Sequence, residues 1–152
     1  MAHHISGIIG SPAVLRNFSH ENSFHAPAAL EGGLAFLPLD DDHLDTLFPS
    51  PGQFDPAMNY VSDALKKVLA ILSEAGSIAF VETEYHGGMG AQGATAYRDG
   101  ECVLKPRTEE SGVISEALRL LGVVAQWGKD EFDTVGLGQH RNNEGWMEAG
   151  CS

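Results

Sequence analysis

The chain has 152 residues and a net charge of −12; 43% of its residues are hydrophobic and 20% are charged. A chain of this length buries enough surface to fold as one domain without a metal or disulfide, and its composition is that of a globular protein. Its acidity argues against DNA, RNA and anionic membranes, which would repel it, whereas a basic protein or a cation would be attracted.

The first third of the chain alternates short apolar runs with polar segments. An opening strand is predicted at residues 4–9, and residues 14–19 fit either a second strand or a helical turn. Residues 22–33 have the composition of a loop, and residues 33–39 that of a strand. Three aspartates at 40–42 precede an apolar run and predict a capped helical turn, which the following prolines end.

The clearest predicted helix covers residues 55–75. Asp55 is a suitable N-cap, and Pro56 fits the first helical position. Apolar residues then recur at spacings of three and four, which predicts one buried stripe over about five turns. Gly76 ends the helix. The stripe consists of Ala57, Tyr60, Val61, Ala64, Leu65, Val68, Leu69, Leu72 and Ala75.

Strands are predicted after this helix, at residues 77–85 and on both sides of Asp99-Gly100, a pair that favours tight turns. A glycine-rich loop at 88–93 is expected to join them. Further helices are predicted at 111–123 and 129–135.

Because no helix separates the middle strands, they should pair antiparallel. We therefore predict an α+β fold with a mainly antiparallel sheet packed against one long helix and one or two shorter ones. It should form a single domain over residues 1–141, followed by a tail at 142–152 that Trp146 anchors.

The glycine-rich segment matches a nucleotide-binding pattern by letter only. Residues 88–93 read Gly-Met-Gly-Ala-Gln-Gly, but a dinucleotide fingerprint requires a helix directly after it. The sequence after Gly93 predicts a strand, so we favour a hairpin whose glycines serve the backbone. No Walker lysine and no kinase catalytic motif accompanies the pattern.

Ionisable side chains cluster just before these glycines. In a strand, Glu82, Glu84 and His86 share one face at intervals of about 7 Å. They are candidate metal ligands or an acid–base pair, with Gln92, Asp133 or His140 as further contributors if the fold returns them. The alternative is that Glu82 and Glu84 lie on a solvent-exposed face while the residues between them face the core.

The same region is the predicted functional surface. Glycine recurs five times between residues 87 and 100, and each glycine weakens a hairpin through its conformational entropy. A bend of the sheet over the long helix would also explain the glycines. No catalytic residue and no cofactor is predicted. The predicted ligand- or partner-binding residues are Glu82, Glu84, Tyr85, His86, Gly88, Gly90 and Gln92.

The cysteines and the hydropathy of the chain predict where in the cell the protein is found. Cys102 and Cys151 do not form a disulfide framework, so free thiols in a reducing cytoplasm are predicted. The N-terminus lacks the features of a signal peptide, and no apolar run approaches the roughly 20 residues of a membrane span.

Two stretches together resemble a pattern in small uncharacterised bacterial proteins. The first has Glu-Thr-Glu-Tyr at 82–85, Gly-Gly-Met-Gly-Ala-Gln at 87–92 and Tyr-Arg-Asp-Gly at 97–100. The second covers residues 114–123, with Asp-Glu-Phe-Asp at 130–133 and Gly-Leu at 136–137. Acidic one-domain proteins of this kind are often similar to immunity proteins that neutralise bacterial toxins, and the resemblance, over residues 80–141, implies no catalytic residue.

The leading expectation is therefore a non-catalytic interaction protein, of the immunity kind, that recruits a basic partner. The alternative is a small enzyme or metal-binding protein that uses Glu82, Glu84, His86 and Gln92.

Overall fold

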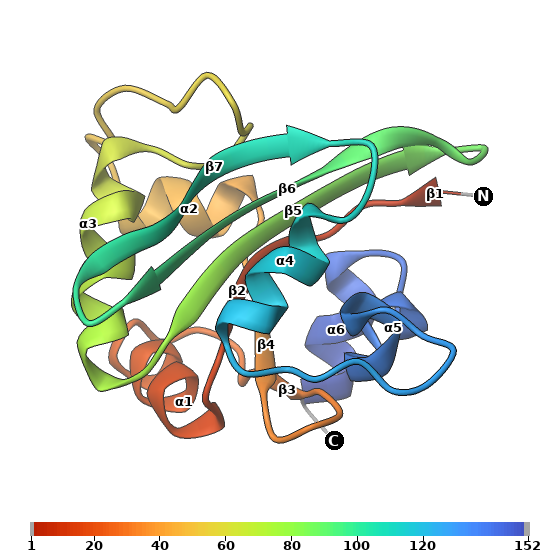
Figure 1. The fold of residues 1–152 in the computed structure, drawn as a ribbon. Coiled ribbons are helices and arrows are strands. Elements are labelled where there is room, and N and C mark those ends of the chain that lie inside the picture. Colours follow the sequence, from red (N-terminus) through yellow and green to blue (C-terminus); the bar gives the residue numbers. More distant parts are fainter. Residues whose placement is uncertain (1, 151–152) are drawn as a thin grey trace.

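A computed structural model of the chain describes residues 2–150 and shows an α+β protein built on an antiparallel sheet (Figure 1). The strands run in the order β3-β4-β2-β5-β6-β7, and β1 pairs with β5 beyond the end of β2. The strands are β1 (Ala2–His3), β2 (Ser6–Gly10), β3 (Ala28–Ala29), β4 (Ala35–Pro38), β5 (Ile78–His86), β6 (Met89–Arg98) and β7 (Glu101–Glu109).

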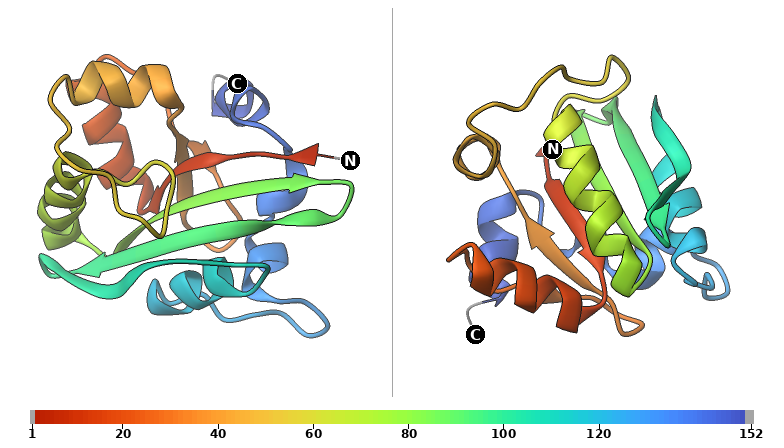
Figure 2. Two further views of the ribbon diagram at one scale, coloured as in Figure 1. Left: turned by 90° about the horizontal axis from the view of Figure 1, so that it is seen from above. Right: turned by 90° about the vertical axis from the view of Figure 1, so that its left-hand side faces the viewer.

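Helices cover both faces of this sheet. Seen from above, α1, α2 and α3 lie on one side of β5–β7 and α4 lies on the other (Figure 2). One core holds alternate strand residues such as Ile8 and Phe80 against Leu65 of α3, and the other holds Ile9 and Val81 against α4. The helices are α1 (Pro12–Glu21), α2 (Asp41–Leu47), α3 (Asp63–Leu72), α4 (Val113–Leu120), α5 (Glu131–Val135) and α6 (Asn143–Gly150), with 3₁₀ turns at Ser73–Ala75 and Leu137–Gln139.

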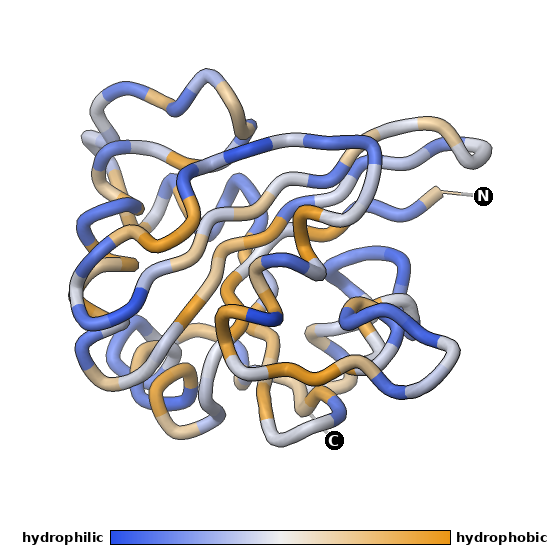
Figure 3. The backbone as a smooth tube through the Cα atoms, in the orientation of Figure 1, coloured by the Kyte–Doolittle hydropathy of each residue, from blue (hydrophilic) through white to orange (hydrophobic). Residues whose placement is uncertain are grey.

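Burial on both faces explains why the centre of β5 is apolar without alternation. Residues Ile78 to Val81 are wholly buried, and Figure 3 shows the hydrophobic centre of the sheet inside more polar connecting segments. A strand with only one buried face would alternate instead. No helix within residues 2–150 combines the length and apolar character that crossing a membrane requires.

Two tight turns set the register of the long hairpins. Gly87 and Gly88 have φ of 60° and 83°, and Asp99 and Gly100 have φ of 52° and 82°. Positive φ at both central residues is typical of type I′ turns, whose twist matches that of the flanking strands. The glycine-rich segment is therefore a two-residue turn followed by β6. The prediction that the segment joins two antiparallel strands and opens no helix is confirmed, so the helix that a dinucleotide fingerprint requires is missing here.

The predicted helix at 55–75 is wrong in its first two turns, and the expectation of one long helix fails with it. Helix α3 has 10 residues, as does α1. The hydroxyl of Ser62 accepts the backbone N–H of Leu65 and caps α3. Asp55 instead accepts the N–H of Ala57, two residues on, and closes a local turn. Residues 48–62 thus form a loop that folds back over the sheet.

Two further segments differ from expectation. Residues 14–19, which fitted a strand or a helix, lie in α1, which Ser11 caps. Most of the expected tail is helix α6, in which Trp146 is 1% exposed and packs edge-on against Phe36. Helix α6 thus contributes Trp146 to the hydrophobic core, and Cys151 lies outside the described residues.

Candidate functional site

A pocket of about 330 Å³ is lined by residues of β5, β6 and β7 and by Asn59 of the loop that precedes α3. Small residues of β6, Ala91 and Gly93, line it together with Glu82 and Glu84 of β5. The pocket wall is close-packed at Gly93, where a Cβ would approach Glu82, Thr108 and Met58 to within about 3.2 Å. The remaining lining residues are Asn59, Thr83, His86, Met89, Gly90, Gln92 and Thr108.

The 48–62 loop forms one wall of this pocket through two contacts with the sheet. Oε1 of Glu82 accepts the backbone N–H of Asn59 at 2.7 Å. Thr108 of β7 donates its hydroxyl to the carbonyl of Ala57. Asn59 and Thr108 were not predicted as site residues, since only the pairing of distant segments brings them beside β5.

Glu82 is buried, so the alternative that placed it on a solvent-exposed face is wrong for this residue. It is 5% exposed, and this burial raises the pKa of its carboxyl, although hydrogen bonds from the Asn59–Tyr60 segment oppose the rise. Glu84, farther along the same face, adds to the rise through its negative charge. Glu82 thus presents a carboxyl group that loses its proton less readily than an exposed glutamate.

Glu84 and His86 are exposed at the outer end of the pocket. The Nε2 of His86 lies 4.0 Å from Oε1 of Glu84, with both side chains mostly in solvent. Within residues 2–150, no group of three or more histidine, cysteine, aspartate or glutamate side chains converges closely enough to hold a metal ion. Glu82, Glu84 and His86 therefore share a face, as predicted, without forming a ligand set.

Gln92 and Tyr85 serve the opposite face of the sheet. Gln92 accepts the backbone N–H of Ile114 at 2.8 Å and so caps the start of α4. Its amide donates to the hydroxyl of Tyr85, which in turn donates to the carbonyl of Glu110. Both side chains were predicted to contact a ligand or partner, but their polar groups are used in holding α4 and its preceding loop against the sheet.

Gly88 and Gly90 shape the hairpin rather than the pocket chemistry. Gly88 occupies the turn, where space is open around its backbone. At Gly90, with φ of 151°, a Cβ would lie 1.9 Å from the carbonyl oxygen of Glu84. Only glycine therefore permits β5 and β6 to approach each other at this point.

A second pocket, of about 290 Å³, is lined by three carboxylates, those of Asp40, Asp41 and Glu144. Tyr60 also lines this second pocket, and its hydroxyl shares a hydrogen bond of 3.1 Å with Nε2 of His4. Burial raises the pKa of Tyr60 most, followed by the negative charges of Asp41, Glu82, Glu84 and Asp40. The pKa of Tyr60 is thus raised by negative charges from both pockets.

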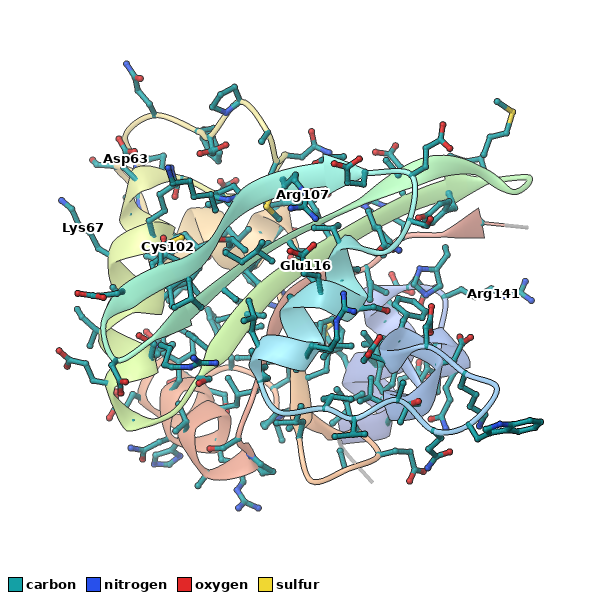
Figure 4. The ribbon with its side chains drawn as sticks, in the orientation of Figure 1. Asp63, Lys67, Cys102, Arg107, Glu116 and Arg141 are labelled. Carbon is teal, nitrogen blue, oxygen red and sulfur yellow. The ribbon has the colours of Figure 1, made fainter. Side chains whose placement is uncertain are left out.

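We call this surface the acidic groove and define it by residues Asp40, Asp41, Tyr60, Glu82, Glu84 and Glu144. Neither pocket has a lysine or arginine among its lining residues. Two cations elsewhere pair with carboxylates: Arg107 and Glu116 meet between β7 and α4 (Figure 4), and Lys66 pairs with Asp55. The nearby Arg141 directs its side chain away from the body of the protein (Figure 4).

The fold and site define an acidic α+β protein with helices on both faces of an antiparallel sheet and a groove lined by carboxylates. A scan against protein-family models finds no match, and searches of curated proteins and of solved structures find no similar protein.

Proposed function

We propose that this chain is a non-catalytic interaction protein whose acidic groove binds a basic protein partner, in the manner of immunity proteins that neutralise toxins. One observation carries the proposal: five carboxyl groups line the two pockets, four of them act on the pKa of Tyr60, and no lysine or arginine lines either pocket. A lysine or arginine side chain of a partner could reach each pocket. The net charge of −12 would steer such a partner toward the groove.

The shape of the site favours a protein segment over a compact small molecule. The pockets are open, and carboxylates that line each of them act on the pKa of Tyr60. An extended chain can place successive side chains into separate pockets, whereas a small ligand needs one enclosed cavity. An exposed free thiol at Cys102 is compatible with the cytoplasmic location that we propose.

A labelled oligo-arginine peptide provides the test, with binding followed by fluorescence anisotropy. Any protein of this charge attracts such a peptide, so the comparison must be between variants of equal charge. We expect Asp41→Asn combined with Glu84→Gln to weaken binding by about tenfold or more, since each contact of a charged pair contributes on the order of 1 kcal/mol.

The matched control removes the same two charges away from the groove, as Glu74→Gln with Glu101→Gln, both exposed. The control should retain most of the affinity. Equal losses of affinity in the two double variants would show that only the net charge matters and that the acidic groove is not the binding site.

One observation favours a second candidate, a small acid–base enzyme. Glu82 combines burial and a raised pKa with a position on a pocket wall, an arrangement often found in catalytic carboxyls. Of the residues first expected to act with it, His86 lines the same pocket, whereas the amide of Gln92 is bound to α4. A pH-dependent turnover that Glu82→Gln abolishes, in a chain that still folds, would favour this candidate over the interaction protein.

A further inference from the structure

The loop between α4 and α5 carries the most exposed aromatic side chain in the described part of the chain. Trp127 is 100% exposed and Val124, three residues earlier, is 83% exposed. The loop projects from the body beside α5 (Figure 1). Tryptophan is seldom left in water, and it is enriched among residues that dominate protein interfaces. The acidic groove involves neither residue.

A pocket of about 310 Å³ lies on the same part of the surface. Five apolar residues line it: Leu34, Leu121, Val123, Val124 and Val135. This volume is at the small end of ligand pockets, roughly 300 Å³, and is large enough for one aromatic side chain. Val124 belongs to both features, since it lines the pocket and lies on the loop that bears Trp127.

Charges beside the two features are opposite in sign. Glu31 lines the pocket, and Lys129 lies two residues after Trp127. Both side chains are exposed, and among residues 2–150 neither takes part in an ion pair. A chain that inserts Trp127 into this pocket of another copy would bring its Lys129 toward that copy's Glu31.

We propose that this face is a homodimer interface, in which Trp127 of each chain enters the pocket of the other. A two-fold interface uses the same patch on both subunits and must be self-complementary. This patch meets that requirement because it holds a protruding aromatic residue, an apolar pocket, the cation Lys129 and the anion Glu31. Trp127 is the principal contact, and the pair of Lys129 with Glu31 fixes the register.

The salt dependence of this dimer is the reverse of that expected for the acidic groove. Each chain carries a net charge of −12, so two copies repel each other over long distances. Added salt screens this repulsion and leaves the apolar contact intact. The dimer should therefore tighten as salt is raised, whereas a complex of the groove with a basic partner should weaken.

Sedimentation velocity of the full chain tests the proposal. Protein concentrations up to about 1 mM would detect a dimer with a dissociation constant as weak as about 1 mM. We expect a concentration-dependent species of twice the 16.2 kDa chain mass. Trp127→Ala should weaken its formation by on the order of 30-fold or more. Since Trp127 is fully exposed, this variant should fold normally. Ile71→Ala is the matched control, because Ile71 is 66% exposed on α3.

Charge reversal tests the register. Lys129→Glu and Glu31→Lys should each weaken the dimer, and the double variant should recover most of the lost affinity. A chain that stays monomeric throughout the concentration range would overturn the proposal, as would a dimer that Trp127→Ala leaves unchanged.

Discussion

Gly90 is the residue at which the β5–β6 hairpin tolerates no side chain. Gly90→Ala should lower the free energy of unfolding by about 2 kcal/mol or more, because its Cβ would collide with the backbone of Glu84 at a positive φ. Gly88→Ala meets no atom within 4 Å and should cost only about 1 kcal/mol for its positive φ. Urea denaturation measures both variants, and equal costs would show that the strands can separate at Gly90.

Glu82 makes the stability of the protein depend on pH in a defined direction. Its pKa is raised in the folded state, so below the pKa of the unfolded chain, about 4.3, the carboxyl is neutral in both states and burial carries no ionisation penalty. As the pH rises from there through the folded-state pKa, the unfolded state gains an advantage. Above the folded-state pKa this loss of stability is complete.

Glu82→Gln removes this dependence, because an amide does not ionise and can still accept the N–H of Asn59. The variant should gain stability relative to the wild type between pH 4 and neutrality, which denaturation curves at successive pH values would detect. If the difference between the two proteins does not change over this range, Glu82 has an ordinary pKa in the folded state.

At the scale of elements, α3 packs against the sheet through fewer apolar residues than the predicted helix at 55–75 would have used. The buried residues of α3 are Leu65 and Leu69. Leu65 and Leu69 are wholly buried, and Leu65→Ala and Leu69→Ala should each cost about 2–5 kcal/mol. Ile71→Ala, on the exposed side of the same helix, serves as the control and should cost well under 1 kcal/mol. Losses below about 1 kcal/mol at both leucines would show that the stripe does not pack against the sheet.

Helix α6 packs against the core on the α4 side of the sheet, chiefly through Trp146. Trp146→Ala should cost about 3–5 kcal/mol, since the indole is buried against Phe36. Trp146→Phe should cost far less, because the phenyl ring fills most of the space that the indole occupies. It also removes the buried indole N–H, which has no hydrogen-bond partner within the described residues. Thermal or chemical denaturation distinguishes the two variants, and a small effect of Trp146→Ala would mean that α6 is dispensable.

Local chemistry made several elements predictable. Asp99-Gly100 specified a hairpin turn, Asp40 specified a helix cap, and the apolar run before Glu82 specified a strand. The errors arose where two local signals competed. Asp55 and Ser62 are both good caps, and only the packing of residues 48–62 over the sheet, with Asn59 bonded to Glu82, selects Ser62.

The site was predictable only in part for the same reason. Alternation along β5 placed Glu82, Glu84 and His86 on one face, as the structure shows. No short-range pattern could reveal that Gln92 caps α4 or that Asn59, Tyr60 and Asp41 approach β5, because these contacts join segments more than 20 residues apart.

At the scale of the whole molecule, the account gives one chain two surfaces of opposite character. The acidic groove comprises Glu82 and Glu84 of β5 with Asp40, Asp41, Tyr60 and Glu144, whereas the apolar pocket is partly lined by the loop that bears Trp127. Salt separates their functions, since it should weaken binding at the groove and strengthen association through Trp127.

Backbone amide NMR during a titration with an oligo-arginine peptide tests the central claim most directly. The account predicts that the largest shift changes fall on Asp41, Tyr60 and Glu84 and on their neighbours in the acidic groove, and that they diminish as salt is added. Shift changes spread evenly over all exposed carboxylates, or concentrated on the loop that bears Trp127, would contradict it.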